Sequence, residues 1–148
     1  MSFEVSKSYG HERGLSCTFR QWRANSHCRL LHGYALRVTI VVGSESLDQR
    51  NWVHDYGAFK PVERWLRTFF DHTTLIAADD PQLGTFYELN ERKLIDLRVM
   101  AAVGCEAFAR FIAEGAPFGF PKGVFLKSVT VAEHGSNAAT YYAQVKHA

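Results

Sequence analysis

The feature that most constrains the fold is the spacing of apolar residues along the chain. This spacing changes from the pattern of a strand to that of a helix and back. Tyr34–Gly43 is rich in β-branched residues and stops at a glycine, which predicts a strand. From Tyr56 onward apolar residues recur at helical spacing, with Asp55 as the expected N-cap of an amphipathic helix. The apolar stripe consists of Phe59, Val62, Leu66 and Phe69.

Segments on either side extend this pattern. Leu15–Trp22 has short, partly alternating apolar character and predicts another strand, whereas the polar stretch 71–84 predicts a loop. A second helix is expected from about Gly104, and Gly115 should end it. Its apolar face would consist of Phe108, Phe111 and Ile112.

The chain finishes in two predicted strands, 123–134 and 138–145, although the alternation slips once between Leu126 and Val129. The order is therefore β-β-α-α-β-β, which predicts an α+β fold with a four-stranded antiparallel sheet backed by two helices. Such a sheet has open edges, so we expect oligomerisation through them.

Composition and charge exclude several classes of protein. With 148 residues, 47% of them hydrophobic, the chain is expected to form a single domain over residues 1–148. A net charge of +2 without a basic run argues against nucleic-acid binding. No apolar stretch reaches the roughly 18 residues that cross a bilayer, and the N-terminus is too polar for a secretory signal. Because three widely spaced cysteines do not make a disulfide framework, we expect a cytoplasmic protein with reduced thiols.

Two short segments combine groups that can transfer protons. Cys28 lies four residues before His32 in a loop that leads into the Tyr34–Gly43 strand, and metal spacings such as C-x2-C are absent. Asp71 precedes His72 directly after the first helix, where the carboxylate could orient the imidazole as an acid or base. The alternatives are an incidental cysteine and a histidine that interacts with the helix dipole.

Two further candidate residues, Glu133 and Cys105, lie at the ends of predicted elements. Glu133, at the end of an apolar strand, could accept two parallel N–H bonds from an amino-pyrimidinone edge, or it could be an ordinary solvated strand end. Cys105-Glu106 opens the second helix, where a helix N-terminus could lower the pKa of the thiol. For Cys105 a small buried structural residue is the favoured interpretation.

Four motifs in order give these residues a common context. The chain resembles the 6-pyruvoyl-tetrahydropterin synthase / 6-carboxy-tetrahydropterin synthase (QueD) family over about residues 15–142. The matching segments are CRLLHGYALRVTI (28–40), WVHDYGAFKPVERWL (52–66), DHTTL (71–75) and VTVAEHGSNAATY (129–141).

The resemblance implies a tunnelling fold (T-fold), a homotrimer or homohexamer, and a pterin substrate, 7,8-dihydroneopterin triphosphate, bound between subunits. It implies that Cys28 is the thiol acid/base, with Asp71 and His72 as its relay from a neighbouring subunit. Glu133 would anchor the pterin ring. The family reaction eliminates triphosphate, and the QueD branch, on the route to queuosine, also releases acetaldehyde.

The family binds zinc through three histidines, and this chain departs from that pattern. Of the three positions only His32 is histidine, whereas the others are Phe19 and Tyr34. One imidazole does not hold zinc tightly, so we expect the metal to be weakly bound or lost. A substitute set of Cys17, His27 and His32 is the alternative.

The second helix also departs from the family, because the usual Pro-Thr-x-Glu reads Val103-Gly104-Cys105-Glu106. Three functions remain open at this point: a pterin-processing lyase, a diverged homologue that binds a pterin or purine-like ring without the zinc-dependent reaction, and a metal-free aldolase-type enzyme.

Overall fold

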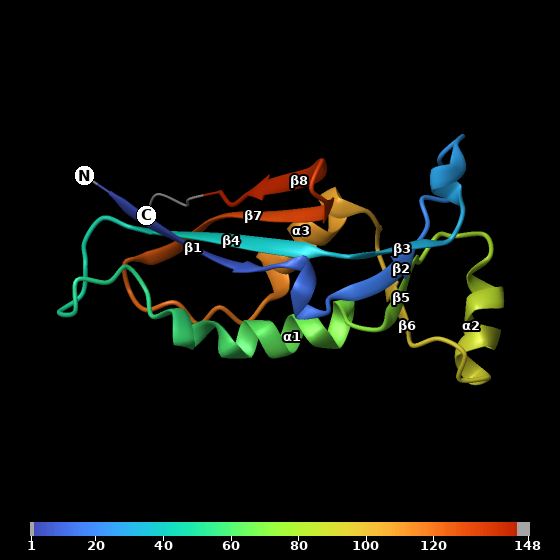
Figure 1. Ribbon diagram of the computed structural model, residues 1–148, viewed down its shortest axis with the longest axis horizontal. Coiled ribbons are helices and arrows are strands. Elements are labelled where there is room, and N and C mark those ends of the chain that lie inside the picture. Colours follow the sequence, from blue (N-terminus) through green and yellow to red (C-terminus); the bar gives the residue numbers. More distant parts are fainter. Residues whose placement is uncertain (1, 145–148) are drawn as a thin grey trace.

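The computed structural model describes residues 2–144, which form two four-stranded sheets and three α-helices (Figure 1). The main sheet has the strand order β1-β4-β7-β8 and is antiparallel throughout. This confirms the predicted α+β class with a four-stranded antiparallel sheet. Its strands are β1 (Phe3–Tyr9), β4 (Arg37–Ser44), β7 (Val124–His134) and β8 (Asn137–Tyr142).

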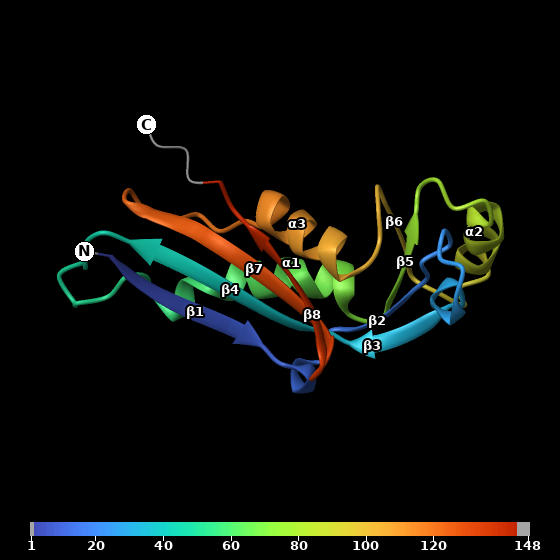
Figure 2. The same ribbon diagram turned by 90° about the horizontal axis from the view of Figure 1, so that it is seen from above.

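Two helices, α1 (Lys60–Phe70) and α3 (Cys105–Gly115), cover one face of the main sheet, as Figures 1 and 2 show. A 3-10 turn, Tyr56–Phe59, leads into α1. The Asp55 carboxylate accepts a 2.8 Å hydrogen bond from the Gly57 N–H at the start of this turn, so Asp55 is confirmed as a cap.

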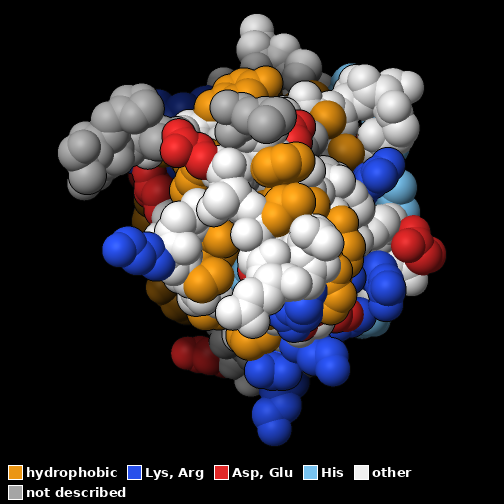
Figure 3. Space-filling view, turned by 90° about the vertical axis from the view of Figure 1, so that its left-hand side faces the viewer, with side chains coloured by type: hydrophobic (Ala, Val, Ile, Leu, Met, Phe, Trp, Pro, Cys, Tyr) orange, Lys and Arg blue, Asp and Glu red, His pale blue; other side chains and the backbone are white. Residues whose placement is uncertain are grey.

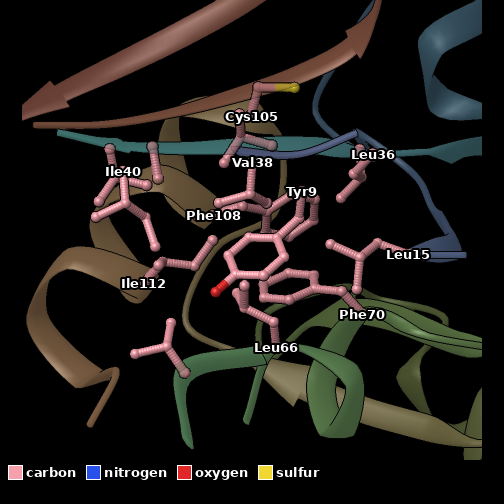
Figure 4. Close-up of a cluster of buried hydrophobic side chains, with 14 of the residues drawn as sticks. Tyr9, Leu15, Leu36, Val38, Ile40, Leu66, Phe70, Cys105, Phe108 and Ile112 are labelled. Atoms are coloured by element: carbon pink, nitrogen blue, oxygen red, sulfur yellow. The ribbon is translucent and has the colours of Figure 1, made fainter. Parts of the chain in front are cut away.

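The core lies between these helices and the main sheet (Figure 4). Phe108 of α3 is fully buried at its centre, and its ring meets the rings of Phe19 and Phe70 edge-on at centroid distances of 5.2 and 5.3 Å. Tyr9 is also buried, and its hydroxyl donates to the Phe59 carbonyl at 3.3 Å. The core therefore joins both helices to β1 and to the segment that contains Phe19.

The smaller sheet has the order β3-β2-β5-β6. It lies beyond one end of the main sheet, with helix α2 (Leu83–Glu91) beside it (Figure 2). β2 pairs antiparallel with β3, whereas β5 runs parallel to both of its neighbours. The strands are β2 (Ser16–Phe19), β3 (His32–Ala35), β5 (Thr73–Ala77) and β6 (Leu97–Met100).

The structure corrects the first predicted strand. Within Leu15–Trp22 only Ser16–Phe19 is a strand, and it belongs to the smaller sheet. The strand of the main sheet that sequence reading missed is Phe3–Tyr9, at the sheet edge. Most of its side chains are exposed or half-buried, so its sequence is mixed and polar and lacks a clear strand pattern.

The prediction of a loop over 71–84 was also wrong. Every residue of β5 is buried, and α2 begins at Leu83. A short strand that is paired on both sides and covered on both faces does not alternate between apolar and polar residues, so the period-2 signal is absent. The last strand ends at Tyr142, and position 145 of its predicted range lies outside the described residues.

The slip in alternation before Val129 has a structural cause. The β4–β7 pairing shifts between Val41, opposite Ser128, and Val42, opposite Leu126. Lys127 is thus the extra residue of a β-bulge, and the phase of the strand changes across it.

Figure 3 faces the end of the molecule opposite the smaller sheet, where hydrophobic side chains gather among polar ones. Exposed Trp52 and Tyr56 line a hollow of about 410 Å³ there. His54 is buried in its wall between the rings of Phe59 and Phe120, and burial lowers the pKa of this imidazole. None of the helices in residues 2–144 is long and apolar enough to cross a membrane.

Replacing Phe108 with alanine should destabilise the protein by about 3–5 kcal/mol, because it leaves a cavity where three aromatic rings meet. Leu94→Ala is the matched control, since Leu94 is 61% exposed and its truncation should change the free energy of unfolding by no more than about 0.5 kcal/mol. Urea denaturation measures both. Equal effects of the two substitutions would show that Phe108 is not central to the core.

Candidate active site

Three aromatic side chains meet where the smaller sheet joins the core. In the β2–β3 pairing Phe19 lies opposite His32, and Cys17 lies opposite Tyr34, so all four side chains share one face. The ring centroids of Phe19 and His32 are 5.3 Å apart, those of Phe19 and Tyr34 are 6.1 Å apart, and those of His32 and Tyr34 are 5.4 Å apart. The three positions that the family resemblance assigns to zinc ligands thus form one cluster.

Gly33 allows the two strands of this cluster to approach closely. A Cβ at this position would lie 2.8 Å from the backbone oxygen of Cys17 and 2.9 Å from a methyl carbon of Thr18. Any larger residue would push β3 away from β2. The glycine between His32 and Tyr34 is therefore a requirement of the strand pairing.

Cys28 lies in a short 3-10 turn (His27–Arg29) that Ser26 caps, and its side chain is half-exposed. The Gln21 N–H donates to the Cys28 carbonyl at 2.9 Å. The Arg20 guanidinium donates to the Arg29 carbonyl at 3.2 Å. The end of β2 thus holds the loop that presents the thiol.

Arg20 is itself fixed by a buried carboxylate that sequence reading missed. Its Nε and Nη2 atoms donate to the two oxygens of Asp80 at 2.7 and 2.9 Å. Burial pushes the pKa of Asp80 upward, but the hydrogen bonds from Arg20 and the Gln82 N–H outweigh it and hold the pKa below its usual value. Arg20 and Asp80 are 60 residues apart, so no local spacing could have indicated the pair.

Glu133 occupies a bulge near the end of β7. Ala132 pairs with Ala138 and His134 pairs with Asn137, which leaves Glu133 as the extra residue. A bulge of this kind turns a side chain away from the regular strand direction. The side chain of Glu133, which is half-buried, therefore does not follow the regular in-and-out alternation of β7.

Tyr34 lies between the rings of His32 and His134. Partial burial and the neighbouring Glu133, Cys28 and Cys105 all raise its pKa. The ring of His134 lies 5.9 Å from the Tyr34 ring, so the end of β7 borders β3. Within one chain, His32 and the end of β7 that carries Glu133 therefore lie on either side of Tyr34, and the Cys28 turn directly precedes β3.

Asp71 and His72 form a second unit at the end of α1. The His72 Nδ1 and an Asp71 oxygen are 2.5 Å apart, and Arg67 donates to the other Asp71 oxygen at 3.2 Å. Since Arg67 also bonds Glu63, the carboxylate is fixed from the helix side. His72 has a left-handed backbone, with φ of 57°, and its side chain is 87% exposed. The imidazole is therefore oriented and open to a partner.

Within one chain this second unit is set apart from the first. The His72 N–H bonds the Ser16 carbonyl, whereas Phe19, three residues further along β2, lies opposite His32. Three residues of strand span about 10 Å. Among residues 2–144, no hydrogen bond or ring contact joins His72 to Cys28.

The two other thiols are structural. Burial first, then neighbouring charge, raises the pKa of Cys17 and of Cys105 to about 12 in each case. The favoured interpretation of Cys105 as a small buried residue is confirmed, because the side chain is 7% exposed. Neither thiol is activated as a nucleophile.

The residues at the family's zinc positions do not fit that metal. Phe19 has no donor atom and is fully buried, and a tyrosine ligates zinc only after losing its proton. The His32 Nδ1 donates to the Leu30 carbonyl at 2.6 Å, which leaves Nε2 as the single imidazole nitrogen available. Among residues 2–144, no three His, Cys, Asp or Glu side chains lie close enough to hold a metal ion, so the substitute set is not assembled within one chain.

Comparison with known proteins gives a family match over most of the chain. Residues 9–144 match the family model described as 6-pyruvoyl tetrahydropterin synthase. A 6-carboxy-5,6,7,8-tetrahydropterin synthase of Aquifex aeolicus is 26% identical over 75% of this chain and 76% of its own length. The corresponding Rickettsia felis protein is 31% identical over 38% of this chain, and the chain covers 42% of that relative's length.

Solved structures show the same fold. An uncharacterized protein from Wolinella succinogenes superposes with a TM-score of 0.80 at 19% identity, over 97% of this chain and 99% of that one. The Plasmodium falciparum 6-pyruvoyl tetrahydropterin synthase gives 0.68 at 16% identity over the same shares of the two chains. The fold is therefore the T-fold, as the sequence motifs predicted.

Asp80→Asn should destabilise the protein by about 3 kcal/mol, because it breaks a buried, doubly hydrogen-bonded ion pair. The Asp80 pKa is lowered on folding, so its stabilisation is present at neutral pH and is lost as the pH falls below roughly 4. Asp79→Asn is the adjacent control, since its bond to Arg23 is exposed to solvent and should contribute little to the free energy of unfolding. Thermal unfolding at pH 7 and pH 3 measures both, and an Asp80 effect that does not shrink at pH 3 would contradict the charge argument.

We expect the purified protein to hold clearly less than one tightly bound zinc per subunit, because one imidazole nitrogen at the family positions is too few. Phe19→His combined with Tyr34→His should raise the zinc content, whereas either change alone should do much less. Elemental analysis after mild chelation measures this. Near-stoichiometric zinc in the unchanged protein would show that the ligand count is mistaken.

Proposed function

Because the chain belongs to the 6-pyruvoyl tetrahydropterin synthase family, we propose that it is a pterin-processing lyase acting on 7,8-dihydroneopterin triphosphate or a related pterin. The relatives named as 6-carboxy-5,6,7,8-tetrahydropterin synthases support the QueD-type reaction as the more specific form of this proposal.

The observation that carries the proposal is the packing of Tyr34 between His32, which follows the Cys28 turn, and His134, which follows Glu133, at ring-centroid distances of 5.4 and 5.9 Å. A pterin presents an amino group and a ring N–H side by side, and a carboxylate pairs with both in a bidentate arrangement. Glu133, set on a bulge and half-buried, has the placement that such an anchor needs. A ring bound there would direct its side chain toward the Cys28 loop.

The proposed chemistry is proton transfer on the pterin side chain. Cys28 takes or returns a proton on one side, and His72, oriented by Asp71, acts on the other. Because His72 is exposed and set apart from Cys28 within one chain, we propose that a neighbouring subunit supplies it.

Oligomerisation through the sheet edges would supply that neighbour. β1 and β8 are the outer strands of the main sheet, each with one unpaired side among the described residues. Pairing of these edges between subunits would satisfy their backbone groups and close a barrel. We propose a homotrimer, or a homohexamer of two trimers, with pterin as the small-molecule partner.

A second candidate is a homologue that binds a pterin or purine-like ring without the family reaction. Phe19 favours it, because a fully buried apolar ring occupies a position where the family has a metal ligand. A metal-free aldolase-type cleavage is the catalytic variant of this candidate. Analysis of the products formed from dihydroneopterin triphosphate separates the three.

Glu133→Ala should weaken pterin binding by about 1.5–3 kcal/mol, or roughly 10- to 150-fold, because it removes a charge-assisted hydrogen-bond pair. The fold should persist, since Glu133 lies at a strand end. Glu88→Ala on the exposed face of α2 is the control and should leave binding unchanged. Fluorescence titration with a pterin measures the affinities, and an unchanged affinity in Glu133→Ala would rule out the anchor.

Cys28→Ala and His72→Ala proteins should each be inactive alone and regain part of their activity when mixed. The reason is that mixed oligomers contain some interfaces with both native groups. Subunit exchange is verified by mass spectrometry of differently labelled chains, and light scattering verifies the oligomer. Mixtures that exchange subunits yet stay inactive would contradict the shared site, as would a monomer at micromolar concentration.

A further inference from the structure

The aromatic cluster at β2–β3 contains one hydroxyl, and it points to a role for Tyr34 that the family pattern does not assign. We propose that the Tyr34 hydroxyl takes over the task of the family's metal by donating a hydrogen bond to the side-chain oxygen of the bound pterin. This inference rests on the proposed function and specifies a catalytic residue for it.

Position is the first support. Tyr34 shares the β2–β3 face with His32 and Phe19, at ring-centroid distances of 5.4 and 6.1 Å. Tyr34 is thus one of the three family ligand positions, and its ring lies beside the residues at the other two. Phe19 packs edge-on against Phe108 and is part of the core, so it offers no polar atom to a ligand.

The chemistry of the hydroxyl is the second support. A tyrosine O–H is protonated at neutral pH and donates one hydrogen bond. Among residues 2–144 the Tyr34 hydroxyl makes no hydrogen bond to another group, and the residue is half-buried. Tyr9 and Tyr141, by contrast, each donate to a protein oxygen. Tyr34 is thus a donor free to bind a ligand.

The surroundings of Tyr34 are the third support. Glu133, the proposed ring anchor, directly precedes His134, whose ring lies 5.9 Å from the Tyr34 ring. Cys28, the proposed base, lies in the turn just before His32, whose ring lies 5.4 Å from that of Tyr34. Because the Tyr34 ring lies between those of His134 and His32, a pterin held at Glu133 with its side chain directed toward the Cys28 turn would extend along Tyr34. His32 completes the group, because its Nδ1 bond to the Leu30 carbonyl directs the lone pair of Nε2 away from the backbone.

The catalytic step is proton abstraction with no change of oxidation state. The base takes the proton from the side-chain carbon next to the ring, the C–H bond breaks, and its electron pair is delocalised into the conjugated ring. The Tyr34 O–H remains bonded to tyrosine while its hydrogen bond withdraws electron density from the oxygen on that carbon. The adjacent C–H becomes more acidic, which is the effect that a Lewis acid would have there.

The test compares Tyr34→Phe with the unchanged protein, both treated with a chelator, in turnover of 7,8-dihydroneopterin triphosphate and in pterin affinity. The substitution removes one oxygen and keeps the ring contacts. We expect kcat to fall about 10²-fold, with pterin affinity within about threefold and the melting temperature unchanged. Tyr87→Phe, on the exposed surface of α2, is the control and should match the unchanged protein.

Two results would overturn the role of Tyr34 while leaving the proposed function in place. One is a Tyr34→Phe protein as active as the unchanged one. The other is an unchanged protein that loses activity on chelation and regains it with zinc. A protein that neither binds nor converts any pterin would refute the proposed function itself, and the role of Tyr34 would fall with it.

Discussion

The antiparallel pairing of β2 with β3 connects the hydrophobic core to the candidate site, because residues of this pair belong to both. On one strand Phe19 is buried against Phe108. On the other, His32 and Tyr34 lie across from Phe19 and Cys17. The strands approach closely because position 33 is a glycine. A change in this register would displace core and site together.

This pairing explains how the family's metal position can change without loss of the fold. A phenylalanine at position 19 adds an apolar ring to an aromatic cluster that already contains Phe108 and Phe70. The position thus contributes to stability through burial rather than through metal coordination. The backbone contacts of neighbouring segments hold the two polar groups at the rim: the Gln21 N–H donates to the Cys28 carbonyl, and Tyr34 pairs with Cys17 across the two strands.

Positioning of the site relies on contacts between segments far apart in the chain. Arg20 connects the end of β2 to the Cys28 loop and to Asp80. The bulge at Glu133 sets the direction of the proposed ring anchor. The Asp71–His72 unit, by contrast, is built locally at the end of α1 and is exposed. These differences are the basis for the proposal that two subunits share the site.

Local signals made part of this structure predictable. The cap at Asp55, the buried positions Val62 and Leu66 of α1 and the slip in alternation before Val129 could all be identified from spacing within a few residues. The predicted stripe ended at Phe69, whereas the fully buried ring at that end of α1 is Phe70. The edge strand β1 and the buried strand β5 were missed, because one is mostly exposed and the other is covered on both faces.

For the site, the motifs identified the residues of interest but not their arrangement. Asp71 and His72 are adjacent in sequence, so their contact could be predicted. The pair of Arg20 with Asp80 and the contact of Tyr34 with His134 depend on strands that only the fold brings together.

A crystal structure of a pterin complex, with anomalous diffraction data at the zinc edge, tests the central claim most directly. The account predicts a pterin ring paired with the Glu133 carboxylate, and the Tyr34 hydroxyl about 3 Å from the side-chain oxygen of the ligand. It also predicts no anomalous peak beside His32. A zinc peak there at full occupancy, or a pterin bound away from Glu133, would contradict it.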